Sequence, residues 1–245
     1  RRSKNIVLSK KKIIELSQKN QVGFDQLIYI EKEINDVTPL IIFNSDGNEV
    51  SACGNGSRCI AYLLCMERKI KDISLKTNER ILKAKILGTF QVKLDMGQPI
   101  FKWEKIPLSK DIDTKNINLS IDNHKFTGGF AINVGNPHIV FFVKDCYDIN
   151  LKNIGPKIEN NNLFPEKCNV TFAQIINKNN ILINVWERGA GLTKACGTAA
   201  CATGVSSYLK GLTDKTVNIK FKEGILKIDF ENEQNIFMSG SVSKV

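Results

Sequence analysis

The hydrophobic positions of this 245-residue chain follow two spacings, the alternation typical of β-strands and the three-to-four-residue repeat typical of amphipathic helices. Helical spacing is found in residues 9–20 and after positions 54 and 197, and a polar helix and loop are expected over residues 150–162. The other apolar runs are short and are bounded by Gly, Pro and Asn, which indicates strands and turns. The expected strands are residues 40–43, 73–77, 81–87, 90–96, 130–134, 139–143, 169–176, 180–186, 217–221, 225–230 and 236–239.

Residues 98–123 interrupt this pattern. They are polar and include Pro99 and Pro107, so we expect irregular structure there. The chain is therefore expected to form two half-domains, residues 1–110 and residues 111–245. The pattern leaves open whether the last residues return to the first half-domain.

Two stretches far apart in the chain share one layout. An aromatic and a polar residue open each of them, Phe43-Asn44 in the first and Trp186-Glu187 in the second. After turn residues that include Gly, both reach Ala-Cys-Gly, at positions 52–54 and 195–197, and a single offset superimposes these positions. Two copies of one unit, each presenting one cysteine, predict two half-sites that face each other.

Each Ala-Cys-Gly leads into a helical pattern. We expect Asn55 and Thr198 to be the N-cap residues, so that Cys53 and Cys196 come just before a helix. Free N–H groups and the positive end of the helix dipole collect there, and they are expected to lower the pKa of the thiol and to bind a carboxylate. A thiolate could then remove the proton next to that carboxylate, while a second thiol returns a proton to the opposite face. This arrangement predicts stereoinversion without pyridoxal phosphate or metal.

Further motifs accompany the two cysteine stretches over most of the chain: Gly23-Phe-Asp-Gln26, Phe43-Asn-Ser-Asp-Gly47, Cys53-Gly-Asn-Gly-Ser-Arg-Cys59, Gly135-Asn-Pro-His138, the region of Asn169, Glu187-Arg-Gly-Ala-Gly191 and Ala195-Cys-Gly-Thr198. In this order the chain resembles the diaminopimelate epimerase family. Each motif alone is weak, but the set is highly specific.

The resemblance implies an α+β fold of two pseudo-symmetric half-domains, each a sheet wrapped around a central helix, with the active site in the cleft between them. It also implies that Cys53 and Cys196 are the catalytic acid and base and that no cofactor is needed. The implied substrate-binding residues are Gln26, Asn44, Gly54, Asn55, Asn136, His138, Asn169, Glu187, Arg188, Gly197 and Thr198.

The implied activity converts LL-2,6-diaminopimelate to the meso isomer, for bacterial lysine and cell-wall synthesis, in a homodimer. One alternative is a proline or hydroxyproline racemase of the same fold. Asn55, where that group usually has His, and Arg188, which suits a second charged amino-acid head, argue against it. The other alternative is a non-catalytic basic binding module.

Composition and charge change this picture little. The net charge of +10 comes from scattered lysine rather than from clustered Arg with aromatic residues, so we expect a solvated surface and no nucleic-acid partner. Seven cysteines without a disulfide-like framework or Cys-x-x-Cys, and with only two histidines, favour a reduced cytoplasmic protein without zinc. Cys59, Cys65, Cys146, Cys168 and Cys201 are expected to be structural. No apolar run is long enough to cross a membrane, and nothing at the start resembles a secretory signal.

The resemblance also concerns the ends of the chain. The family normally begins with a strand and a Gly-Leu-Gly-Asn-Asp-Phe-type turn whose Asn contacts substrate, and Arg1 lies downstream of that point. The chain also ends early by comparison, at Val245. Whether the native protein has these ends stays open.

Overall fold

The computed structural model describes residues 8–50, 53–78, 80–232 and 234–243. The chain forms two compact units. Unit 1 takes the described residues up to Leu94 and from Ser241 onward, and unit 2 is Asp95–Gly240.

The division between the units falls before the position near residue 110 that the sequence suggested. Residues just after Leu94 pack with unit 2, because Ile106 and Leu108 are buried in its core and Ile100 pairs with Asn133. Residues from Ser241 onward belong to unit 1. Most residues of this connecting stretch are polar, so its sequence pattern did not indicate that Ile106 and Leu108 pack in the core of unit 2.

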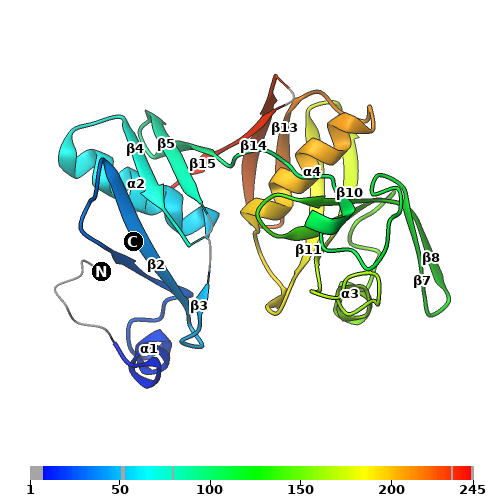
Figure 1. Cartoon of the computed structure of the whole chain (residues 1–245), viewed down its shortest axis with the longest axis horizontal. Coiled ribbons are helices and arrows are strands. Elements are labelled where there is room, and N and C mark those ends of the chain that lie inside the picture. The colour runs from blue at the N-terminus through cyan, green and yellow to red at the C-terminus, as the bar shows by residue number, and fades with distance from the viewer. Residues whose placement is uncertain (1–7, 51–52, 79, 233, 244–245) are drawn as a thin grey trace. The chain divides into compact units, whose positions relative to one another are not determined.

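Unit 1 contains α1 (Lys10–Ser17), β1 (Gln26–Ile30), β2 (Val37–Asn44), β3 (Glu49–Val50), α2 (Gly54–Arg68), β4 (Asp72–Lys76), β5 (Ile81–Gly88) and β6 (Gln91–Asp95). Its sheet has the order β1-β2-β4-β5-β6, with β3 beside β2. The β2–β4 pair is parallel and the other pairs are antiparallel. Helix α2 packs on β4 and β5 and buries Ala61, Leu64 and Cys65 (Figure 1).

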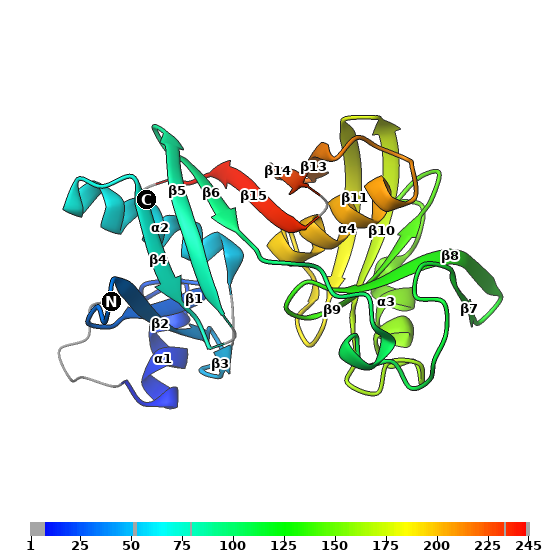
Figure 2. The same cartoon turned by 45° about the horizontal axis from the view of Figure 1, so that its top comes forward.

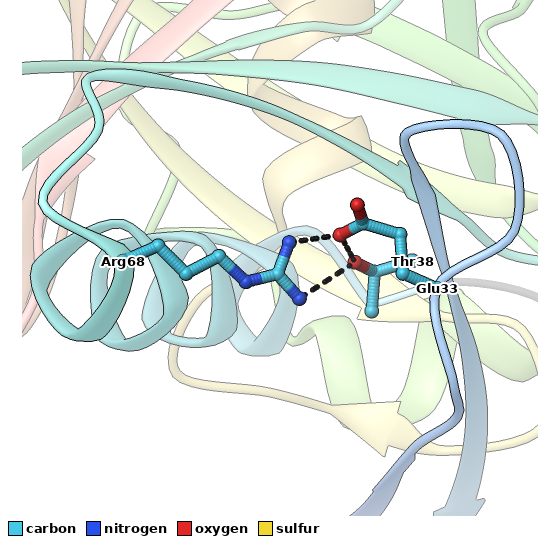
Figure 3. Close-up of polar contacts among 3 residues, drawn as sticks. All are labelled: Glu33, Thr38 and Arg68. Atoms are coloured by element: carbon cyan, nitrogen blue, oxygen red, sulfur yellow. Dashed lines mark hydrogen bonds and ion pairs between the residues drawn. The ribbon is translucent and has the colours of Figure 1, made fainter.

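The C-terminal end of α2 is fixed to the sheet of unit 1 by three polar side chains (Figure 3). Arg68 forms an ion pair with Glu33 and donates from Nη2 to the Thr38 hydroxyl (3.3 Å). That hydroxyl donates in turn to Glu33 Oε2 (3.2 Å), and Thr38 is fully buried on β2. Because the ion pair is partly exposed it stabilises little by itself, and the buried hydroxyl provides most of the geometric constraint.

Unit 2 contains η1 (Trp103–Lys105), β7 (Ile117–Ile121), β8 (His124–Asn133), β9 (Pro137–Phe142), α3 (Leu151–Glu159), β10 (Asn169–Asn177), β11 (Asn180–Glu187), β12 (Gly191–Leu192), α4 (Gly197–Leu209), β13 (Thr216–Phe221), β14 (Gly224–Glu231) and β15 (Asn235–Ser241). Its sheet has the order β15-β14-β13-β11-β10-β9-β8-β7, with β12 beside β11. The β9–β10 and β11–β13 pairs are parallel within this otherwise antiparallel sheet.

The two faces of the unit 2 sheet carry different side chains because successive residues of a strand point to opposite sides. On one face, Phe141 and Phe172 are buried in a core that includes residues of α3. His138 and Asn169, which are partners in the β9–β10 register, lie on the other face, where α4 packs. Figure 2 shows α4 running across β10 and β11. The face that carries α4 is therefore also the face that carries polar candidate residues.

Helix α4 approaches the sheet closely because its sequence is rich in small residues. Ala199, Ala200 and Ala202 are fully buried. A Cβ on Gly204 would lie 2.7 Å from Cγ2 of Ile228 on β14. The small side chains thus bring the start of α4, with Cys196, close to the strands beneath it.

Residues 98–116 are largely irregular apart from η1, as expected, but the expectation was wrong for residues 117–121, which form β7. β7 and β8 form an antiparallel hairpin, seen at the edge of the sheet in Figure 2. Ile117, Leu119 and Ile121 alternate inward and join the core beside α3. The burial of these residues against distant parts of the chain stabilises a strand among polar residues.

The expected α+β class is confirmed, because each unit combines a mixed sheet with helices packed on it. The repeated layout also reappears in the order of elements. β2, β3 and α2 follow one another in unit 1 as β11, β12 and α4 do in unit 2. Of the repeated positions, Ala52 lies outside the described residues.

Thr38→Val tests the polar contact that fixes α2. We expect the free energy of unfolding to fall by about 1–2 kcal/mol, because the substitution removes one donor and one acceptor of a buried network while keeping the shape of the side chain. Urea unfolding measures this loss. In an Arg68→Ala, Glu33→Ala background the hydroxyl has lost both partners, so the same substitution should be nearly neutral. An equal loss in both backgrounds would show that the three side chains are not coupled.

Candidate active site

Both candidate cysteines are the N-cap residues of their helices. Cys53 precedes α2 and Cys196 precedes α4, each with extended backbone dihedrals. The expectation that Asn55 and Thr198 would be the caps was wrong, since both lie in the first helical turn. As N-cap residues, Cys53 and Cys196 lie directly at the helix N-terminus, where backbone N–H groups lack partners within the helix.

The third helical residue occupies the same position after both cysteines, but only Cys53 accepts a cap hydrogen bond through its side chain. In unit 1 the Gly56 amide donates to the sulfur of Cys53 (3.2 Å). In unit 2 the Ala199 amide, at the equivalent position, favours the thiolate of Cys196. The preceding amides are those of Gly54 and Asn55 in one helix and of Gly197 and Thr198 in the other, and they suit a carboxylate.

Cys196 is nevertheless a thiol in this state. Burial raises its pKa well above the ordinary value, and the Glu187 carboxylate adds to the rise through its charge and by hydrogen bonding. Thr198, whose Oγ1 lies 3.4 Å from the sulfur, and the Ala199 amide lower the pKa by less. The expectation of a lowered thiol pKa is therefore wrong for Cys196, because desolvation outweighs the helix N-terminus.

Two of the unit 1 candidates contact each other, and a third contacts a neighbouring arginine. Gln26 and Asn44 are partners in the β1–β2 register, and the Gln26 side-chain amide donates to Asn44 Oδ1 (3.0 Å). Asn55 Oδ1 accepts from Arg58 Nη2 (3.0 Å) in the first turns of α2. Arg58 thus orients the Asn55 side chain, and the Asn55 amide stays at the helix end.

His138 is fully buried beside Asn136 in unit 2. One ring nitrogen, Nε2, lies 2.8 Å from Asn136 Oδ1. Burial lowers the pKa of His138 to about 3, and the charge of Arg188 adds to the effect. The ring is therefore neutral, and its contact with the Asn136 oxygen requires the Nε2–H tautomer.

Asn169 holds neighbouring backbone on both sides. Its Nδ2 donates to the Pro137 carbonyl (2.9 Å), and its Oδ1 accepts from the Arg188 amide (2.9 Å). The Asn169 side chain is buried, so these contacts fix the position of the Arg188 backbone. Arg188 itself is exposed and donates from Nη1 to the Glu166 carbonyl (3.1 Å).

Sequence reasoning missed Glu159, a buried carboxylate at the end of α3. It accepts hydrogen bonds from the Trp186 indole (2.7 Å) and from the Gly189 amide (3.0 Å), on either side of Glu187 and Arg188. A signal was present, because the buried positions of α3 fall at helical spacing and Glu159 continues that stripe. The stripe is Leu151, Ile154, Gly155, Ile158 and Glu159.

None of the other five cysteines is the N-cap residue of a helix. Burial raises the pKa of Cys146 to about 12 and also raises that of Cys65 and Cys168. Cys201 is buried within α4, whereas Cys59 is exposed on α2. All seven cysteines are described, and no disulfide links them.

No group of three or more His, Cys, Asp or Glu side chains in the described ranges is arranged to hold a metal ion. Among the same residues, no helix is both long and apolar enough to cross a membrane.

Glu187→Gln should make Cys196 more reactive, because it removes the nearby charge that favours the thiol. We expect its alkylation by iodoacetamide at pH 8 to accelerate severalfold. Peptide mass spectrometry reports the rate, with the exposed Cys59 of the other unit as the internal reference. An unchanged ratio of the two rates would mean that Glu187 does not control this thiol.

His138 should stay neutral in the folded protein between pH 8 and pH 5. Its pKa of about 3 lies below the ordinary 6.5, so the unfolded chain takes up a proton that the folded chain does not. The free energy of unfolding therefore decreases, through this residue, as pH falls from about 6.5 toward 3. Imidazole NMR signals of a His124→Gln variant, which retains a single histidine, measure the titration. A midpoint near 6.5 would contradict the burial argument.

The chain is similar in sequence to proteins of one known family. A family model for diaminopimelate epimerase matches residues 130–245. The diaminopimelate epimerase of Pelagibacter ubique is 51% identical over 247 residues, covering 100% of this chain and 90% of the relative. That of Wolbachia sp. subsp. Drosophila simulans is 42% identical, covering 91% of this chain and 84% of the relative.

Solved structures share the fold at much lower identity. A hydroxyproline epimerase from Agrobacterium vitis aligns with a TM-score of 0.64 at 11% identity, over 94% of this chain and 77% of that one. A PhzF-family phenazine biosynthesis protein from Bacillus anthracis aligns with a TM-score of 0.62 at 16% identity, over 96% and 86%. These likenesses show the fold alone. The sequence relatives show more: this chain belongs to the diaminopimelate epimerase family.

Proposed function

We propose that this chain is a cofactor-independent isomerase that converts LL-2,6-diaminopimelate to the meso isomer, a step in lysine and peptidoglycan synthesis. Family membership supports the reaction. The observation that carries the mechanism is that each of two cysteines is the N-cap residue of a helix, where unpaired amides are close to the sulfur. The Gly56 amide donates to Cys53, and the Ala199 amide lowers the pKa of Cys196 by less than burial raises it.

The two cysteines act as a base and an acid on one α-carbon. Cys53 removes the α-proton as a thiolate, and the electron pair of the C–H bond moves into the α-carbon and its carboxylate. The Cys196 thiol then donates its proton to the opposite face, which leaves Cys53 protonated and Cys196 ionised. The raised pKa of Cys196 supports the donor role toward the LL isomer. The reverse reaction exchanges the two roles.

The helix amides stabilise the negative charge that develops during proton transfer. Those of Gly54, Asn55, Gly197 and Thr198 are proposed to bind the reacting carboxylate, because fixed N–H donors need no reorganisation when charge appears on its oxygens. Such donors matter here because the α-proton of an amino acid is a very weak acid.

A second set of side chains is proposed to bind the distal amino-acid head. Arg188 is suited to bidentate contact with its carboxylate, and Glu187 to its ammonium group. Asn44, oriented by Gln26, and Asn136, in contact with neutral His138, add polar groups of defined orientation. Asn169 contributes by holding the Arg188 backbone.

A proline or hydroxyproline racemase is the alternative reaction on this fold. Its substrate lacks a distal charged head, so the exposed guanidinium of Arg188 would have no carboxylate to bind. A homodimer and a cytoplasmic location are further parts of the proposal. Sedimentation tests the first, and the need to keep both thiols reduced is the reason for the second.

Proton NMR of LL-diaminopimelate in D2O with reductant tests the proposal. We expect the α-proton signal to disappear as the meso isomer forms. Cys53→Ala and Cys196→Ala should each slow the reaction by about 10²–10⁴-fold, the usual contribution of a positioned acid or base.

Cys59→Ala is the matched control, because it removes an exposed thiol on the same helix as Cys53 and should leave the rate unchanged. Proline and hydroxyproline are assayed alongside. Exchange of their α-protons without exchange in diaminopimelate would favour the alternative racemase. Exchange in none of them, together with salt-sensitive retention on nucleic acid, would favour a binding module.

A further inference from the structure

We propose that Glu159 is a positioning residue that holds Glu187 and Arg188 in the geometry that substrate binding requires. The inference rests on the proposed function, because that function assigns the distal head to these two residues. Glu159 lies on α3, outside the motifs that carry the family resemblance. Its role is to anchor the chain on either side of the pair.

The two carboxylate oxygens of Glu159 have separate partners. Oε2 accepts from the Trp186 indole at 2.7 Å, and Oε1 accepts from the Gly189 amide at 3.0 Å. Trp186 comes just before Glu187, and Gly189 comes just after Arg188. A single buried side chain thus fixes both ends of the two-residue segment.

Strand alternation makes the anchoring effective. Trp186 packs beside the core that includes α3, so the next residue of β11, Glu187, points to the opposite face. A shift or rotation of β11 at Trp186 would move the Glu187 carboxylate away from Cys196, on whose thiol it acts. Fixing the indole on one face therefore fixes the carboxylate on the other.

The Trp186 ring has little space in which to move. A Cβ on Gly155, one turn before Glu159 in α3, would lie 2.6 Å from atoms of the ring. Helix α3 thus presents a flat backbone surface to the indole and, one turn later, an acceptor to its N–H. Packing and hydrogen bonding restrain the same side chain from the same helix.

The backbone of the turn after β11 is also restrained, by hydrogen bonds to its amides. The Arg188 amide donates to Asn169, the Gly189 amide to Glu159, and the Ala190 amide to the Glu187 carbonyl (3.1 Å). Residues 187–190 form a β-turn closed by this last hydrogen bond. Its third residue, Gly189, has a φ of +73°, and a type II turn requires a positive φ at that position. Three successive amides are therefore engaged, two of them by buried side chains from α3 and β10.

The chemistry of the contact requires a carboxylate. Both partners of Glu159 are N–H donors, so both side-chain oxygens must accept. A glutamine has the same shape but only one acceptor oxygen, and its amide group would meet a second donor. Glu159→Gln therefore breaks one contact and creates a buried repulsion without changing the volume of the side chain.

The experiment compares Glu159→Gln with Ile158→Val, which removes a methylene from a buried neighbour on the same helix and touches no polar group of the turn. We expect Glu159→Gln to raise the KM for diaminopimelate about tenfold, the effect of losing one hydrogen bond to a charged group, with a smaller change in kcat. Ile158→Val should lower thermal stability and leave KM unchanged. Equal KM values for the two variants would overturn the proposal.

A Trp186→Phe background provides a second test. Without the indole N–H, a glutamine at 159 can direct its oxygen to Gly189 and its amide group away from any donor. Glu159→Gln should then change KM by less than about threefold, because only one acceptor is still needed. A tenfold effect in both backgrounds would contradict the two-donor argument.

Nuclear magnetic resonance separates failure of this inference from failure of the proposed function. The chain has two tryptophans, so the Trp186 indole N–H signal is assigned by its absence in Trp186→Phe. In Glu159→Gln we expect that signal to move upfield and to exchange faster with solvent, whatever the enzyme turns over. An unchanged signal would overturn the anchoring role. A changed signal in a protein without epimerase activity would support the anchor and reject the proposed reaction.

Discussion

A helix that begins directly after a cysteine is the constraint on which both half-sites depend. At that position the sulfur lies beside amides that the helix itself does not use, and the same helix end can bind a carboxylate. Cys53 contacts the amide of Gly56, and Cys196 is influenced by the amide of Ala199. One local geometry therefore places a sulfur beside N–H donors, which is the arrangement that the proposed reaction needs.

The two copies of this geometry differ in what surrounds them. Cys53 is partly accessible at the start of α2, whereas Cys196 is buried at the start of α4 and is affected by the charge of the Glu187 carboxylate. Burial and the neighbouring charge keep Cys196 protonated despite its place at a helix N-terminus. A thiol that remains protonated is ready to act as an acid, so the difference in environment supports the different roles proposed for the two cysteines.

Residues that hold the backbone determine the geometry of the side chains that are proposed to bind substrate. Asn169 and Glu159 each hold one amide of the turn after β11, and Gly155 packs against the Trp186 ring. The two faces of the unit 2 sheet are thereby linked, because an anchor on the α3 face fixes a carboxylate on the α4 face. Recognition of a flexible substrate with two amino-acid heads depends on such restraint, since small displacements weaken bidentate contacts.

The sequence alone determined the features that depend on local pattern: most strands, the repeated aromatic-polar-cysteine layout, and a motif set specific enough to identify the family. It did not predict the hairpin that begins at Ile117, the cap positions of Cys53 and Cys196, the protonated state of Cys196 or the role of Glu159. Each of these depends on which distant groups exclude water from a residue or supply its hydrogen-bond partners. Local spacing carries no information about those groups, so only the tertiary structure could decide them.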